Sequence, residues 1–261
     1  MLYPTDLTDD QWQGIKPLLD QGERKCKYNR RELFNAVLYV VKTGCQWRML
    51  PREFPPWQSV YYHFQCLSKS GRLRKLLSAL VRFSRSSLRG KSAYPSAAIL
   101  DAQSVKSTLV SCKKYTGYDG GKKIKGIKRH IAVDTLGHLL EVRIHSAGVA
   151  DRKGGSWVLQ HLKQNHPTIK MIFCDGGYPL VGQAASGNQI LEGYPLQVVQ
   201  RSEKNKGFSV VARRWVVERS FAWIETNRRN SKSFERLPST AEAITQLSAI
   251  RIMLNQLTKY F

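Results

Sequence analysis

The chain has 261 residues, of which 42% are hydrophobic, so it can bury the core of one large domain or of two smaller ones. Lysine and arginine outnumber aspartate and glutamate by 42 to 19, and the net charge of +23 favours a polyanionic partner, nucleic acid before an anionic membrane surface. No apolar run reaches the ~18 residues of a membrane span, the N-terminus lacks a signal-peptide pattern, and the five cysteines are scattered, so we expect a cytoplasmic protein without a disulfide framework or zinc ribbon.

Helical patterns dominate the first third of the chain. They predict helices over about residues 5–20, 29–42, 57–70 and 72–83, separated by a proline-rich loop before Trp57. Between Phe54 and Leu100 there is no acidic residue, whereas eight lysines and arginines occur. This charge pattern favours a helix-turn-helix-like DNA-binding module, with a solvated surface helix as the alternative, and it makes Tyr61 and Gln65 candidate DNA contacts.

After this helical part the pattern changes to alternating strands and helices. The predicted strands are Ile99–Val105, Ile124–Val133, Leu139–His145, Ile169–Asp175 and Leu196–Val199, and the predicted helices are Ser156–Lys163, Val210–Arg229 and Thr240–Leu257. The order of elements is typical of a ribonuclease-H-like fold: three early strands come first, then strands alternate with helices, and helices end the chain. Such a fold is an α/β fold with a mixed sheet and flanking helices. We therefore predict an all-helical DNA-binding domain (1–84), a linker (85–96) and a catalytic core (97–261).

Three acidic residues stand out in this basic chain. Asp101 and Asp175 each follow an apolar run that reads as a buried strand, and Glu218 lies in a helical stretch. A carboxylate at the end of a buried strand carries a desolvation cost unless a partner compensates it, and strand ends form the crevice where α/β proteins bind ligands. The alternatives are strand-terminal caps for the two aspartates and an i, i+4 ion pair with Arg214 for Glu218, with Glu225 as the second choice for the third acid.

Other acids in this part of the chain have ordinary explanations. Asp134 precedes a Thr-Leu-Gly turn, Asp119 lies in a glycine-rich loop, and Asp151 can cap the following helix. Converged carboxylates suit Mg²⁺ or Mn²⁺, and two such ions ~4 Å apart support phosphodiester chemistry. The spacing of the three acids permits this site without specifying it.

A basic, glycine-rich segment between the two aspartates is a candidate DNA-tracking edge, with a solvated hairpin as the alternative. Its candidate contacts are Lys122, Lys123, Lys125, Lys128 and Arg129.

Several sequence blocks, in order, resemble DDE-type transposases of bacterial insertion sequences, in the insertion-sequence-five-like branch. The blocks are Leu7–Trp12, Arg31–Tyr39, Gly44–Pro51, Asp101–Ser104, Gly121–His130, Asp175–Tyr178 and Arg214–Arg229. The resemblance implies a ribonuclease-H-like core, a metal-binding triad of Asp101, Asp175 and Glu218, and DNA or phosphate contacts from Arg214. We add Arg219, next to Glu218, as a candidate DNA contact.

The activity implied by the resemblance is that of an enzyme that binds the terminal inverted repeats of its element and catalyses metal-dependent strand cleavage and strand transfer. Double-stranded DNA is then the partner, a homodimer on DNA the expected assembly, and the nucleoid the place of action. Two positions depart from the family pattern, because Val211 replaces a tyrosine and Glu225 a basic residue. The alternatives are a catalytically silent, transposase-derived DNA-binding repressor and a structure-selective nuclease.

Overall fold

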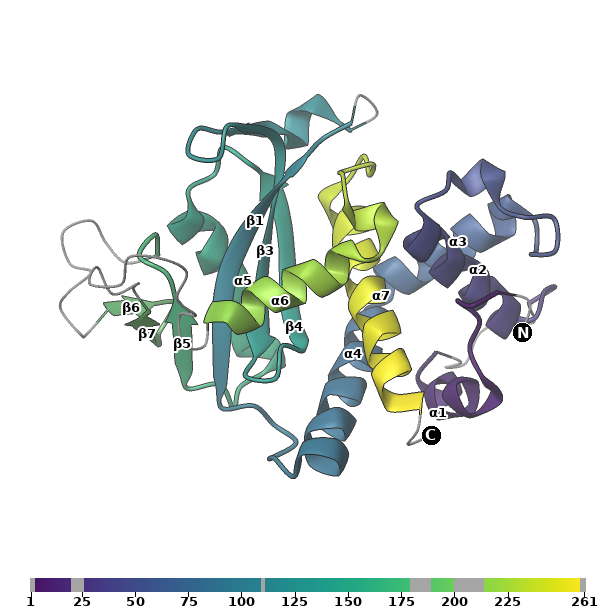
Figure 1. Cartoon of the computed structure of the whole chain (residues 1–261), viewed down its shortest axis with the longest axis horizontal. Coiled ribbons are helices and arrows are strands. Elements are labelled where there is room, and N and C mark those ends of the chain that lie inside the picture. The colour runs from purple at the N-terminus through teal and green to yellow at the C-terminus, as the bar shows by residue number, and fades with distance from the viewer. Residues whose placement is uncertain (1–2, 20–25, 109–110, 179–188, 200–213, 259–261) are drawn as a thin grey trace.

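The structure is a computed structural model and describes residues 3–19, 26–108, 111–178, 189–199 and 214–258. A group of helices lies beside a twisted mixed sheet, and the last helix of the chain runs between the two (Figure 1). Within the described ranges, no helix combines the length and apolar character that a membrane crossing needs.

Four helices form the N-terminal part: α1 (Asp9–Leu19), α2 (Arg30–Thr43), α3 (Trp57–Lys69) and α4 (Arg72–Phe83). Asn29 caps α2 by accepting a hydrogen bond from the Arg31 amide at 2.9 Å, and Gly44, with φ of 72°, ends it in the left-handed conformation that glycine favours. The first helix starts at Asp9 instead of residue 5, because Thr8 and Gln11 form a reciprocal cap there.

The predicted linker is partly helical. A π-helical turn, Ser84–Leu88, continues directly from α4. It forms because the Arg85 side chain turns into the protein, where its guanidinium donates to the Asp134 carboxylate at 2.6 Å. The start of the predicted linker is therefore fixed to the sheet.

In the described part of the chain, seven strands form one sheet: β1 (Ala97–Lys106), β2 (Gly117–Asp119), β3 (Ile124–Asp134), β4 (Leu139–Ser146), β5 (Met171–Cys174), β6 (Gln189–Leu191) and β7 (Tyr194–Val198). Antiparallel pairing joins β1 to β3 and β3 to both β2 and β4. On the other side of β1, strands β5 and β7 add in parallel, and β6 pairs antiparallel with β7. This arrangement confirms the ribonuclease-H-like prediction. The sequence analysis missed β2 and β6 because three residues are too few to show a period.

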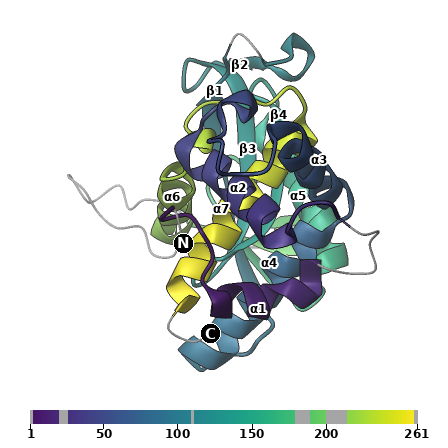
Figure 2. The same ribbon diagram turned by 90° about the vertical axis from the view of Figure 1, so that its right-hand side faces the viewer.

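Helices cover both faces of the sheet: α5 (Asp151–Asn165) on one, and α6 (Arg214–Glu225) on the other with α7 (Pro238–Leu257) (Figures 1 and 2). The helix α5 begins at Asp151, five residues before the prediction, because Gly154 and Gly155 weakened the helical signal. These glycines allow close packing, since a Cβ on Gly155 would lie 2.7 Å from the Tyr178 ring.

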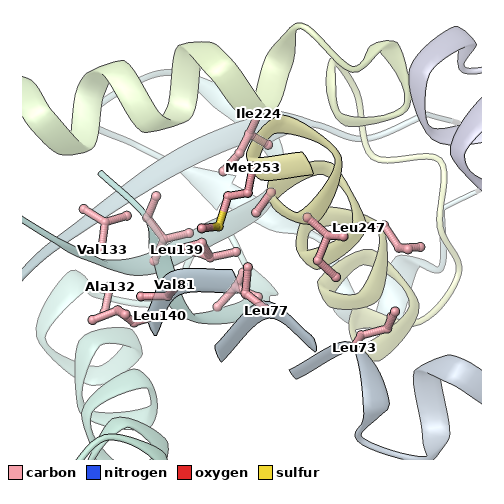
Figure 3. Close-up of a cluster of buried hydrophobic side chains, with 14 of the residues drawn as sticks. Leu73, Leu77, Val81, Ala132, Val133, Leu139, Leu140, Ile224, Leu247 and Met253 are labelled. Carbon is pink, nitrogen blue, oxygen red and sulfur yellow. The ribbon is translucent and has the colours of Figure 1, made fainter. Parts of the chain in front are cut away.

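The hydrophobic core runs through both parts of the chain. Side chains of α4 meet those of β3, β4, α6 and α7 in one cluster (Figure 3). Leu77 from α4 and Leu247 from α7 are each at most 2% exposed. The helical region and the sheet thus share one core, and the division into two domains stays a prediction.

Candidate active site

Asp101 lies on β1 and Asp175 directly follows the neighbouring parallel strand β5, close enough for the charge of Asp175 to act on Asp101. The register of β1 and β5 pairs Ala97 with Met171 and Ile99 with Phe173. Each aspartate comes two residues after a member of the last pair, Ile99 and Phe173. The same register, continued by two residues, would therefore align Asp101 with Asp175. Residues paired in this way point to the same face of a sheet. One prediction needs correction: Asp101 lies in the middle of β1, since that strand continues to Lys106 along β3.

The Asp101 carboxyl group is largely buried, whereas Asp175 is more open. Burial, with a smaller contribution from the charge of Asp175, raises the pKa of Asp101 to about 6, although the hydrogen bond from the Ala102 amide and the charges of Arg214 and Lys122 oppose the shift. Asp175 directly follows β5, its side chain is 30% exposed, and it accepts a hydrogen bond from the Gly177 amide at 2.9 Å. Two carboxylates therefore share one partly desolvated place above the sheet.

Arg214, the first described residue of α6, lies between the second aspartate and the glutamate. One of its terminal nitrogens is 3.9 Å from an Asp175 oxygen and 3.9 Å from a Glu218 oxygen. Glu218 is the most open of the three acids, with 61% of its side chain exposed. The ion pair that we considered as an alternative for Glu218 is therefore present, and through Arg214 it links this residue to Asp175. Val211, the first departure from the family pattern, lies outside the described residues.

In the part of the chain that the structure describes, no three His, Cys, Asp or Glu residues form a group that could hold a metal ion. The carboxylates have the oxygen chemistry that Mg²⁺ and Mn²⁺ prefer. The chemistry of these residues, although not their spacing in this structure, therefore fits such an ion.

The helix that carries Glu218 is held by the turn between β3 and β4. Ser220 Oγ donates to the Gly137 carbonyl oxygen at 2.8 Å, and Arg219 donates to the Leu136 carbonyl oxygen at 2.9 Å. Gly137 has a φ of 89°, and a Cβ there would lie 2.9 Å from Ser220 Oγ. Asp134 organises this turn by accepting hydrogen bonds from the Leu136 and His138 amides, each at 2.9 Å, as expected for a turn residue.

The predicted basic edge divides into exposed and buried members. Lys122, Lys123 and Lys125 are exposed at the turn between β2 and β3, and Lys122 Nζ donates to the carbonyl oxygen of Ala102, the neighbour of Asp101. The expected loop residue Asp119 ends the short strand β2 and shapes this turn by accepting from the Lys122 amide.

Lys128 and Arg129 differ from the prediction of DNA contacts. Lys128 is 6% exposed and bonds the Asp151 carboxylate at 2.7 Å, and Arg129 is 3% exposed and donates to Gln103 and Asn230. Both side chains are held inward by their acceptors, since Lys128 donates to the partly exposed Asp151 carboxylate and Arg129 donates to the buried Asn230. We do not assign DNA contacts to them.

The other candidate contacts are half-buried. Arg219 lies between the rings of Trp215 and Trp223, at 4.4 and 4.5 Å from their centroids. Tyr61 packs edge-to-face on another tryptophan, and Gln65 lies on the same helix α3.

Gln103 is a residue that the sequence analysis missed as part of the site. It lies two positions after Asp101 and therefore on the same face of β1. Its amide nitrogen donates to Glu225 at 2.8 Å, and its oxygen accepts from Arg129 at 2.9 Å. Glu225, the second departure from the family pattern, thus ties the C-terminal end of α6 to the strand of Asp101. The i, i+2 spacing from Asp101 was the available signal.

Comparison with known proteins places this arrangement in a family. The family described as "Transposase DDE domain" matches residues 94–253, and the family described as "Putative transposase of IS4/5 family" matches residues 7–77. An uncharacterized protein of Sinorhizobium fredii, y4sN, is 29% identical over 79 residues, which cover 29% of this chain and 63% of that relative. No solved structure matches. Because the first match spans more than half of the chain, the protein belongs to the DDE transposase family.

Proposed function

We propose that this transposase binds the terminal inverted repeats of an insertion sequence and catalyses cleavage and strand transfer with Asp101, Asp175 and Glu218. The observation that carries the proposal is the register of β1 and β5, which sets two aspartates side by side, with Arg214 linking the second of them to the glutamate on α6.

We propose Mg²⁺ or Mn²⁺, two ions, as the cofactor, held by these three carboxylates. When bound, such ions supply charge stabilisation at a phosphodiester and lower the pKa of a water nucleophile. The protein itself supports this with a largely buried Asp101 beside a second carboxylate, an arrangement whose charge repulsion a cation relieves.

Arg214 has the position of a phosphate contact. Its guanidinium is 26% exposed and lies between Asp175 and Glu218. Because two acceptor carboxylates already orient it toward the site, the group can turn to a DNA phosphate when those carboxylates take up a cation. The exposed Lys122 lies beside Asp101, and the exposed Lys123 and Lys125 fit phosphates farther along the DNA.

Two element ends must meet in one reaction, and we therefore propose a homodimer on DNA that works at the nucleoid. The net charge of +23 supports double-stranded DNA as the partner of this assembly.

The test is cleavage of a labelled duplex that carries the DNA flanking this gene, with Mg²⁺ or with EDTA. We expect metal-dependent nicking at a repeat boundary and a loss of at least about 100-fold in Asp101→Asn and Asp175→Asn, because metal-assisted charge stabilisation is worth several kcal/mol. Asp10→Asn, at an exposed acid of α1, is the matched control and should cleave as the wild type does.

The outcomes separate the alternatives. Repeat binding without cleavage by the folded protein would favour the DNA-binding repressor. Metal-dependent cleavage of branched DNA without preference for an end sequence would favour the nuclease.

A further inference from the structure

A groove lies between the helical region and the segment that joins α6 to α7. Its walls come from the 3₁₀ turn Trp47–Met49 and α3 on one side, and from the 3₁₀ turn Arg228–Asn230 and the residues after it on the other. Figure 1 shows this second segment, in yellow-green, beside α2 and α3. We call it the aromatic groove and define it by Gln46, Trp47, Arg48, Trp57, Tyr61, Cys112, Arg229, Phe234, Glu235, Arg236, Leu237 and Thr240.

Aromatic rings line the groove without being sealed from solvent. Trp47, Trp57, Tyr61 and Phe234 are all partly exposed. Trp47 and Tyr61 are packed edge-to-face with centroids 5.2 Å apart, so these two rings hold each other in place. Arg48 lies over the Trp57 ring at 5.1 Å. Fixed aromatic surfaces of this kind are stacking platforms for flat π-systems.

The groove is also cationic. Arg48 and Arg236 are exposed and form no ion pair within the described part of the chain. The acid in the lining, Glu235, is neutralised by Arg229 at 2.7 Å. Two guanidinium groups therefore remain available for an anionic ligand.

Hydrogen bonds connect the two walls, so the groove is formed before any ligand arrives. Arg229 donates to the Cys45 carbonyl oxygen at 3.0 Å, and Lys42 donates to the Thr226 carbonyl oxygen at 2.8 Å. Arg229 is 8% exposed and packs over Phe234. A pre-formed site avoids the ordering cost that weakens binding.

The size of the groove suits a small piece of nucleic acid. Its volume is about 810 Å³, within the range of ~300–1,000 Å³ that holds ligands of small-molecule size. The bases of a duplex stack on one another and do not present their faces, whereas an unpaired base has a free face for an aromatic ring.

We propose that the aromatic groove binds an unpaired nucleotide of the DNA substrate, with the base on the aromatic rings and its phosphates on Arg48 and Arg236. The proposal rests on the proposed function, because it takes DNA as the substrate. The helix α6 connects the candidate active site to the aromatic groove. Arg214 and Glu218 lie near its start, its last residue accepts a hydrogen bond from Gln103 of β1, and the groove wall at Arg228–Asn230 follows soon after. A strand that frays at the active site can follow this helix to the groove.

The test compares a fluorescein-labelled 12-nucleotide oligothymidine with an abasic strand of the same length, by anisotropy, with the full chain and without metal. We expect the base-containing strand to bind at least about tenfold tighter, because base–aromatic stacking is worth ~1–3 kcal/mol per base. Trp57→Ala should remove about tenfold from oligothymidine binding and leave abasic binding unchanged. Arg236→Gln should weaken both strands alike.

Two controls match these changes. Tyr94→Ala removes an exposed aromatic side chain elsewhere, and Lys75→Gln removes one exposed positive charge on α4. Equal binding of the two strands, or full oligothymidine binding by Trp57→Ala, would overturn the proposal. If Trp57→Ala does not fold, Tyr61→Ala takes its place with the same expectation.

A result in which Trp57→Ala weakens only a 12-base-pair duplex would also overturn the proposal, because the groove would then hold paired DNA. Since no metal and no cleavage enter this test, failure of the groove is distinguishable from failure of the proposed catalysis.

Discussion

The buried ion pair between Arg85 and Asp134 fixes the helical region to the sheet. Arg85 follows α4, and Asp134 ends β3 in the turn that holds α6. The carboxylate is fully buried and accepts from Arg85 at 2.6 Å and from His138 Nδ1 at 3.1 Å. Replacing Arg85 with leucine leaves this carboxylate buried without its main cationic partner.

We expect Arg85→Leu to lower the free energy of unfolding by about 3–5 kcal/mol at pH 7, the cost of removing one partner of a buried pair. Solvent screens this ion pair only weakly, because the Arg85 and Asp134 side chains are 7% and 0% exposed. Urea unfolding followed by tryptophan fluorescence measures this loss. Adding Asp134→Asn removes the stranded charge, keeps an acceptor for the turn, and should recover part of the stability.

The effect should shrink as the pH falls. Burial alone would raise the pKa of Asp134, but the hydrogen bond and charge of His138, with the Arg85 hydrogen bond, hold it below the ordinary value of 3.8. A depressed folded-state pKa contributes stability above the unfolded pKa, and this stability is lost as the pH falls through the folded value. Below about pH 4 the free energy of unfolding of the wild type should therefore approach that of Arg85→Leu.

Arg89→Leu, at an exposed arginine four residues farther on, is the control and should change stability by no more than about 0.5 kcal/mol. If Arg85→Leu costs no more than Arg89→Leu, the pair does not stabilise the fold and the reasoning fails.

Three further outcomes are expected. Gly155→Ala should lower the free energy of unfolding by about 1–3 kcal/mol, because its Cβ would lie 2.7 Å from the Tyr178 ring. Gly120→Ala is the control, because a Cβ there meets nothing within 4 Å, and equal unfolding midpoints for the two variants would contradict this reasoning. Glu225→Lys should tighten duplex binding and steepen its salt dependence by ~0.9 per added phosphate contact, whereas an unchanged slope would place the residue off the DNA path. Burial lowers the folded-state pKa of His130 and His145 below 6.5, so the free energy of unfolding should fall as the pH is lowered from 7 to 5. The expected loss is up to ~1.4 kcal/mol per pH unit for each histidine, and a urea midpoint that does not change with pH would refute this.

Local patterns were sufficient for most elements of the fold. The limits of α4 and the presence of the five longest strands follow from apolar periodicity and from Gly and Pro punctuation, because these depend on neighbours along the chain. Local patterns were insufficient where a contact with a residue far away in the sequence determines the limits of an element. The turn after α4 is helical because Arg85 reaches Asp134, and α5 starts early because its glycines meet Tyr178.

The sequence by itself singled out Asp101, Asp175 and Glu218 as candidates, since an acid after a buried apolar run or in a basic helix is unusual wherever it occurs, and their catalytic role stays a prediction. Tertiary structure alone decided how these residues meet. The parallel pairing of β1 and β5 brings the two aspartates near each other, and Arg214 links Glu218 to Asp175. It also decided that Lys128 and Arg129 point inward while Lys122 stays exposed, because burial depends on elements far away in the chain.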